Sequence, residues 1–319
     1  MSEKTIVNNN TTLASFSDAI VNLANKVAPS VIGIQSKTRG NGSGIVWSAD
    51  GRIVTCSHVV KRLDEVEVVG LSDDKTFSAK VIGNDPYSDI ALLKIEQTTT
   101  LKPIEFNETE NLKAGQFVLA LANPYGDHPS ITEGIVTSSR SSIRGGLWWG
   151  REGGRSFMMD NVIITDARLN PGYSGGPLVD VQGNMIGLNV AYVSSRGIAI
   201  RISKMKSIVD KLSKDGRIKR AYLGVILNTI SLPSDIVIQQ QLNETHHQGL
   251  MVVSVENGTP AKKAGLLIGD VIVKFNKEPV NNVQDLNQLL TNEIIGKSIE
   301  LSVLRGERLT EITIIPGEI

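Results

Sequence analysis

The residues with the clearest capacity for chemistry lie in a glycine-rich run near the middle of the chain. Residues 170–178 read Asn-Pro-Gly-Tyr-Ser-Gly-Gly-Pro-Leu, so Ser174 stands among glycines. Glycine accepts the backbone angles of a tight turn and lets a substrate chain approach closely. The amides of Gly172 and Ser174 can then point at one spot and stabilise the oxyanion of acyl transfer. The segment predicts a nucleophilic serine; a glycine-rich hairpin with a passive serine is the alternative.

A serine nucleophile needs a base beside it, because its hydroxyl barely ionises near neutral pH. The chain has four histidines, at positions 58, 128, 246 and 247. His58 lies within residues 53–60, at the end of an apolar strand run that can hold it rigidly, whereas the other three lie in polar stretches. We therefore expect His58 to be the base, with a purely structural histidine as the alternative.

The base in turn needs a carboxylate that orients it. Asp89 directly precedes residues 90–95, Ile-Ala-Leu-Leu-Lys-Ile, which predict a buried strand. A carboxylate beside such a strand needs a partner, since burial without one costs free energy. Asp85 in the same loop is the competing candidate, and an ordinary turn aspartate is the alternative. With Asp89, the order His58, Asp89, Ser174 is that of chymotrypsin-like peptidases.

The three segments together resemble the HtrA (high-temperature requirement) family of serine proteases. Residues 55–60 resemble its histidine motif, residues 85–95 its aspartate motif and residues 165–178 its serine motif. The similarity runs from about residue 17 to residue 317, in the order of the family.

The resemblance implies a role for each residue. His58 is expected to act as general base and then acid, Asp89 to support its imidazolium, and Ser174 to attack the peptide carbonyl. The amides of Gly172 and Ser174 are expected to form the oxyanion hole. Family members often switch activity by flipping the peptide before that glycine, here around Pro171.

Two segments depart from the family pattern. Tyr173 stands where the family usually has Asn, and Cys56-Ser57 stands where it often has Asn-Ala. Position 173 contributes mainly backbone, so we expect catalysis to survive, although the larger ring can change the balance between loop states. We expect Cys56 to be a small buried residue.

The surrounding pattern indicates a mostly β fold. From residue 31 to about residue 202, short runs rich in Val and Ile alternate with turn residues, as in barrels and sandwiches. The resemblance narrows this to a chymotrypsin-like double β-barrel. We expect a flexible segment 1–16, a protease domain 17–214 whose first helix is capped by Ser17, and a last helix that stops at Gly216.

The remainder, residues 217–319, mixes strands with short helices and resembles an α+β PDZ domain. Its segment Tyr222-Leu223-Gly224-Val225 resembles the carboxylate-binding loop of that domain. The loop amides would capture a peptide C-terminus, and the peptide would add as a strand beside the next β-segment. The alternative is that these four residues are only the first core strand.

The composition restricts the partners and the compartment. Lys+Arg and Asp+Glu both total 33, and this balance offers no broad attraction to nucleic acid. The single cysteine excludes an intrachain disulfide, which favours a reducing compartment or a fold whose core is stable without disulfides.

No leader or spanning segment is visible, so we expect the cytoplasm if Met1 is the native start, and the cell envelope if an export signal or anchor was removed. His246 and His247 lack a third ligand, so we expect no metal and no cofactor.

These features together predict a serine endopeptidase that degrades unfolded or misfolded proteins and is regulated through its PDZ domain. The resemblance also implies a homotrimer or a multiple of it. The alternative is a proteolytically silent chaperone or scaffold that binds protein C-termini. The loop 140–160, with Trp148 and Trp149, is a candidate regulatory element; the other interpretation is that both rings pack on their own barrel.

Overall fold

A computed structural model describes residues 9–36, 40–70, 76–96, 101–106, 112–145, 157–233 and 247–318. The chain divides into two compact units, Met1–Ile218 and Lys219–Ile319. The second unit therefore begins close to the boundary expected at residue 217. Trp148 and Trp149 lie outside the described residues, as does His246. No helix in the described ranges combines the length and hydropathy of a bilayer-spanning segment.

The first helix begins earlier than predicted. Helix α1 spans Asn9–Val27, so Ser17 lies inside it and is not its cap. The prediction of a flexible segment 1–16 is therefore wrong for residues 9–16. Leu13, Phe16 and Ile20 recur at helical spacing and extend the apolar side toward the N-terminus. Phe16 also packs edge-on against Phe117, with ring centroids 5.8 Å apart.

The first barrel follows the short 3₁₀ turn η1 (Ala28–Ser30). It is a closed sheet with the strand order β1-β2-β3-β6-β5-β4. The strands are β1 (Val31–Ser36), β2 (Gly40–Ser48), β3 (Arg52–Thr55), β4 (Glu65–Val69), β5 (Phe77–Asp85) and β6 (Ile90–Ile95). Every residue of β6 except Lys94 is buried, as its predominantly apolar sequence predicts.

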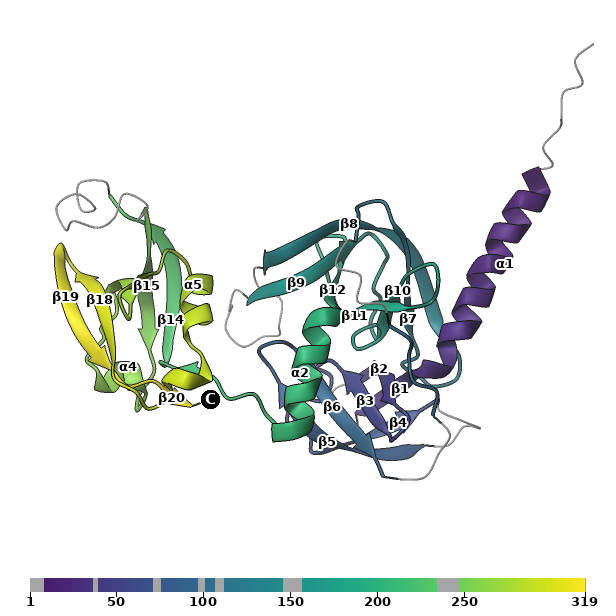
Figure 1. The fold of residues 1–319 in the computed structure, drawn as a ribbon, viewed down its shortest axis with the longest axis horizontal. Helices are drawn as coiled ribbons and strands as arrows, with labels where there is room; N and C mark the ends of the chain where they lie inside the picture. Colours follow the sequence, from purple (N-terminus) through teal and green to yellow (C-terminus); the bar gives the residue numbers. More distant parts are fainter. Residues whose placement is uncertain are drawn as a thin grey trace, which may run out of the picture. The chain divides into compact units, whose positions relative to one another are not determined.

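The second barrel has the same number of strands, in the closed order β10-β11-β12-β9-β8-β7. They are β7 (Phe117–Ala122), β8 (Ser130–Gly145), β9 (Phe157–Thr165), β10 (Pro177–Val179), β11 (Met185–Val193) and β12 (Arg196–Arg201). The two barrels meet where β7 packs on β1 and β2, and Figure 1 shows them side by side. The serine segment leads into β10 and the histidine segment follows β3, so the expected catalytic residues come from different barrels.

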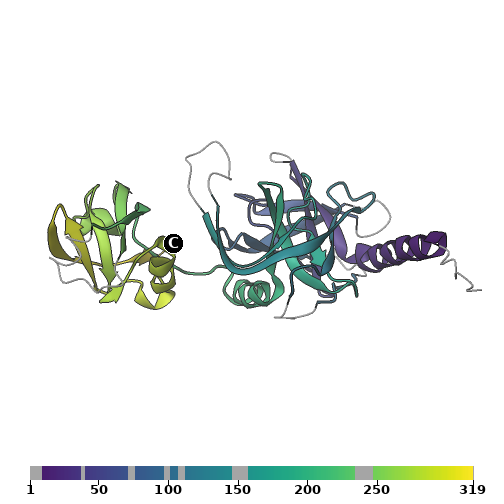
Figure 2. The same cartoon turned by 90° about the horizontal axis from the view of Figure 1, so that it is seen from above.

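Helix α2 (Ile202–Asp215) packs on strands of both barrels, as Figures 1 and 2 show. Its buried face carries Met205, Ile208 and Leu212 at helical spacing. Gly216 ends the helix with φ +69°, and its amide donates to the Leu212 carbonyl at 2.9 Å. The predicted stop at Gly216 is confirmed.

The second unit is a sheet with the main strand order β14-β15-β16-β18-β19, covered by short helices. Its strands are β13 (Ala221–Tyr222), β14 (Val225–Ser231), β15 (Gln248–Val255), β16 (Val271–Phe275), β17 (Glu278–Pro279), β18 (Ile299–Arg305), β19 (Arg308–Ile314) and β20 (Gly317–Glu318). Its helices are α4 (Pro260–Lys263), α5 (Val283–Leu289) and the 3₁₀ turn η2 (Asn292–Ile294). Strand β14 lies at an edge of this sheet, with α5 beside it.

Candidate active site

The structure brings His58 and Asp89 into direct contact. Nδ1 of His58 lies 2.7 Å from Oδ2 of Asp89, and the His58 amide donates to Oδ1 at 2.9 Å. The Ser57 amide donates to the Asp89 carbonyl oxygen at 3.1 Å, which ties the two loops together through the backbone as well. A carboxylate at Nδ1 favours the tautomer that carries its proton there, and this leaves Nε2 to act as the base.

Asp89 reaches this position through an unusual backbone conformation. Its φ is +57°, the left-handed region that Asp tolerates better than most residues, and its side chain is buried at the start of β6. The competing Asp85 has a local role instead: its Oδ2 accepts the Ser88 hydroxyl at 2.6 Å, and its carboxylate also accepts the amides of Tyr87 and Ser88. The geometry therefore favours Asp89 as the partner of His58.

Ser174 comes directly after a tight turn of the backbone at residues 170–173. The Tyr173 amide donates to the Asn170 carbonyl at 3.1 Å, and Gly172 has φ +95°, as a type II turn requires of its third residue. Type I and type II turns differ by a flip of the central peptide, here between Pro171 and Gly172. Among the described residues, the amides of Gly172 and Ser174 have no acceptor. They are therefore available for an oxyanion.

The Ser174 hydroxyl donates to the Val190 carbonyl oxygen at 3.1 Å. It is therefore held by a backbone acceptor of strand β11. Rotation about the Cα–Cβ bond of Ser174 releases this hydrogen bond. Catalytic hydrogen bonds in free enzymes are often long or replaced in this way and form only with substrate bound.

Ser43 on strand β2 connects the serine loop to the first barrel. Its hydroxyl donates to the Gly172 carbonyl at 2.7 Å and accepts a hydrogen bond from the backbone amide of Asn123 at 2.9 Å. Its amide donates to the Ser174 carbonyl at 2.9 Å, and its own carbonyl accepts the Thr55 hydroxyl at 2.7 Å. Ser43 is completely buried, so water does not compete for these bonds. The sequence analysis did not identify Ser43, although the Gly42-Ser43-Gly44 triplet was a signal for a close backbone approach.

The two departures from the family pattern both lie in buried positions. Tyr173 is 3% exposed and packs in the core of the second barrel, where burial raises the pKa of its phenol. Cys56 is buried as expected, with Sγ 3.4 Å from the Asn189 carbonyl oxygen. Burial first, and the charge of Asp89 second, raise the pKa of the Cys56 thiol, so it stays protonated.

The donor atoms of Cys56, His58 and Asp89 lie within 4.8 Å of one another, which is close enough for one metal ion to reach all three. A metal would need the thiolate of Cys56 and would have to displace the hydrogen bond between His58 and Asp89. The raised pKa of the thiol opposes that exchange. The arrangement fits an acid–base pair better than a metal centre.

In the second unit, residues 222–225 form the turn that leads into β14. Tyr222 belongs to β13, Leu223 is buried, and Gly224 has φ +83°. The carbonyls of Leu223 and Gly224 accept the amides of Ala261 and Glu256, whereas their own amides have no acceptor among the described residues. Val225 begins the edge strand β14. The segment therefore presents free amides beside an open strand edge, as a carboxylate-binding loop requires.

Comparison with known protein families matches both units. The "Trypsin-like peptidase domain" family matches residues 42–188, and the "PDZ domain" family matches residues 222–315. The double barrel followed by a PDZ-type domain, expected from the sequence, is confirmed.

Curated relatives cover most of this chain. It is 33% identical over 280 residues to the "Probable periplasmic serine endoprotease DegP-like" of Rickettsia conorii, which covers 86% of this chain and 53% of that protein. It is 32% identical over 313 residues to "Protease Do-like 1, chloroplastic" of Arabidopsis thaliana, with 92% of this chain and 67% of that protein covered. The chain thus spans 53% to 60% of the first two curated relatives. These names refer to the periplasm and the chloroplast, so the cytoplasmic location expected from the N-terminus stays a prediction.

Solved structures with the same architecture align over nearly the whole chain. The "HtrA-type protease AlgW with tripeptide" has a TM-score of 0.70 at 28% identity, covering 94% of this chain and 97% of that one. The "serine endoprotease from Yersinia pestis" has a TM-score of 0.69 at 27% identity, with the same coverage.

Proposed function

Because the chain belongs to the HtrA family of trypsin-like serine proteases, we propose that it is a serine endopeptidase. The observation that carries this proposal is the pair formed by His58 and Asp89 at 2.7 Å, together with a serine turn where the amides of Gly172 and Ser174 have no acceptor among the described residues. His58, Asp89 and Ser174 are the proposed catalytic residues, and the amides of Gly172 and Ser174 the proposed oxyanion hole.

In the proposed acylation step, Ser174 leaves the Val190 carbonyl and turns toward His58. Nε2 of His58 takes the hydroxyl proton while the oxygen attacks the substrate carbonyl, and Asp89 stabilises the imidazolium that forms. The negative charge moves to the carbonyl oxygen, where the amides of Gly172 and Ser174 receive it. Each such donor contributes about 3–4 kcal/mol to the transition state. His58 then gives its proton to the leaving amine.

Deacylation repeats these steps with water in place of the serine. His58 takes a proton from the water, and the hydroxide attacks the ester carbonyl in the same oxyanion site. The proton returns to Ser174 when the ester bond breaks. The protein's own groups carry every proton and charge in this scheme, as expected for a peptidase without a cofactor.

We propose unfolded or misfolded polypeptides as the substrates and their C-termini as the ligands of the second unit. In the part of the chain that the structure describes, the amides of Leu223 and Gly224 have no acceptor, which supports carboxylate capture, and β14 is an edge strand, which supports strand addition. Selection of an exposed C-terminus together with an extended segment distinguishes unfolded from folded chains. This role is protein quality control with a regulatory peptide-binding domain.

We also propose a homotrimer whose contacts include helix α1. Leu13, Phe16 and Val21 expose 70%, 52% and 52% of their surface in the single chain, which is costly for large apolar side chains unless a partner covers them. Multi-angle light scattering tests this: the wild type should have three times the chain mass, and Leu13→Asp should lower it. For the compartment, the relatives' names favour the cell envelope, which fractionation of the native cells tests.

The decisive experiment is labelling with a fluorophosphonate, which reacts with an activated serine. The wild type and Ser207→Ala, an exposed serine on α2, should be labelled, and Ser174→Ala should not. Digestion of casein should follow the same pattern. The hydrogen bond from Ser174 to Val190 gives some support to the silent alternative, a chaperone or scaffold that binds C-termini. A wild type that binds unfolded protein but resists labelling would establish that alternative and refute the peptidase.

A further inference from the structure

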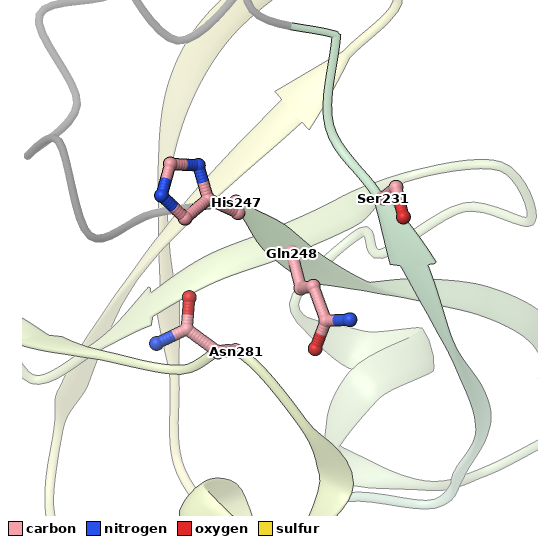
Figure 3. A pocket seen from close by; sticks show the side chains of 4 residues that line it. All are labelled: Ser231, His247, Gln248 and Asn281. Carbon is pink, nitrogen blue, oxygen red and sulfur yellow. The ribbon is translucent and has the colours of Figure 1, made fainter.

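A polar pocket of about 450 Å³ lies at the far end of β14 in the second unit. Ser231, His247, Gln248 and Asn281 line it, and Figure 3 shows their side chains around one space. Ser231 ends β14, Gln248 begins β15, and Asn281 lies two residues before α5. The pocket therefore draws on three separate segments.

The pocket lies at the end of β14, the strand that contacts α5. Leu227 of β14 and Val283 and Leu289 of α5 all pack against the same buried core. Side chains alternate along a strand, so Ser231, four residues after Leu227, lies on the same face. Ser231 also pairs with Gln248 in the register of the two strands, which places both where β14 ends and β15 begins.

The chemistry of the pocket favours a hydrogen-bond donor. Oδ1 of Asn281 is buried and has no partner among the described residues. In Figure 3 this oxygen points toward His247. The backbone amide of Asn281 donates to Oδ2 of Asp285 at 2.8 Å, so a carboxylate lies next to this residue. A buried acceptor without a donor costs free energy, which a donor on a ligand would recover.

We propose that this pocket is a subsite for a side chain with N–H donors, either an amide or a cation, on the peptide bound to the second unit. This rests on the proposed capture of a C-terminus by residues 222–225. That capture fixes the carboxylate at the start of β14, so the upstream peptide must run antiparallel toward Ser231. Ser231 is six positions after Val225, and paired strands advance together, so the subsite meets the residue about six positions before the C-terminus.

The test measures peptide affinity by fluorescence polarisation on the full chain carrying Ser174→Ala, which prevents cleavage. The parent is a decapeptide with a free C-terminus, chosen from a screen, with Ala, Gln, Lys or Glu placed five, six or seven residues before its end. The assay runs at pH 8. At one of these positions, peptides with Gln or Lys should bind about fivefold more tightly than the peptide with Ala, which is the effect of one hydrogen bond. The peptide with Glu should bind no more tightly than the peptide with Ala. A larger gain with Lys than with Gln assigns a cation, and equal gains assign an amide.

The Asn281→Ala variant should reduce the advantage of Gln and Lys to less than twofold. Asn292→Ala, an exposed asparagine of the same unit, should leave it unchanged. A five-residue peptide with the same ending should bind wild type and Asn281→Ala equally. Equal affinities for Ala, Gln and Lys, a preference for Glu, or an advantage that survives Asn281→Ala would overturn the subsite. If peptides bind but do not need a free C-terminus, the proposed capture fails instead.

Discussion

Removal of one buried hydroxyl tests how the serine loop is held. In Ser43→Ala, the Gly172 carbonyl loses its donor at 2.7 Å and the Asn123 amide loses its acceptor at 2.9 Å. The remaining backbone bond from the residue 43 amide to the Ser174 carbonyl does not need the hydroxyl. The change thus removes the hydrogen bond that holds the turn at Gly172 but keeps the one that holds the Ser174 carbonyl.

The magnitude follows from the burial of the two groups. An orphaned buried donor or acceptor costs about 1–3 kcal/mol. Asn123 is 5% exposed, whereas Gly172 is partly exposed and its carbonyl can be rehydrated. We therefore expect a loss of about 2 kcal/mol in the free energy of unfolding. A turn that no longer holds the Gly172 amide in place loses at most one oxyanion donor, a factor of about 10²–10³ in kcat. We expect a tenfold to hundredfold decrease in kcat and little change in KM.

The assay combines kcat and KM on a fluorogenic peptide with denaturant unfolding. The matched control is Ser139→Ala, because the Ser139 hydroxyl is buried and has no partner among the described residues. Its loss should leave activity unchanged and stability equal or slightly higher. Wild-type kcat and stability in Ser43→Ala would refute the role of this hydroxyl, and an equal loss in both variants would show a general packing effect.

Three further changes probe the site. Gly172→Ala should lower kcat more than tenfold, because φ +95° disfavours alanine and its Cβ would lie 2.7 Å from Pro124; full activity would refute the turn geometry. Asp89→Asn should lower kcat by up to about 10⁴ at neutral pH through the wrong tautomer of His58, with little change in KM; a small effect would remove Asp89 from the triad. Burial first, and the charge of Asp89 second, raise the pKa of the Cys56 thiol in the folded protein. The folded state therefore loses stability relative to the unfolded state as pH rises above the unfolded thiol pKa of about 8.5, whereas below that pH the thiol is protonated in both states and this loss is absent. Cys56→Ala should therefore show a smaller decrease in Tm between pH 8 and pH 10, and equal decreases would contradict this.

The parts of the site that could be predicted from the sequence are those fixed by local pattern. Asp89 directly precedes a strand that is apolar except for Lys94, and Ser174 lies next to a turn that needs glycine, so a few neighbouring residues locate each one. Ser43 could not be found in this way, because its role depends on Gly172, 129 residues away, across the contact of the two barrels. The pocket at Asn281 likewise depends on where β14 and β15 end in their register.

The start of α1 was missed for a different reason. Its first turns are rich in Asn and Thr, which favour helix caps and turns over helix interiors. The contact of Phe16 with Phe117 lies far away in the sequence and supports the helix where propensity does not. Tertiary contact thus overrode the local signal.

The short link between the two units has a consequence for substrate choice. Helix α2 ends at Asp215 and β13 begins at Ala221, so residues 216–220 alone join them. Ile218 also packs against the core of the first unit, so the backbone that belongs to neither unit is shorter still. Under the proposed function, a polypeptide bound by its C-terminus would be tethered to the chain that carries Ser174, and tethering raises the local concentration of its other segments above that in solution. A bond with a weakly matching sequence would then be cut more often in a tethered polypeptide than in a free one.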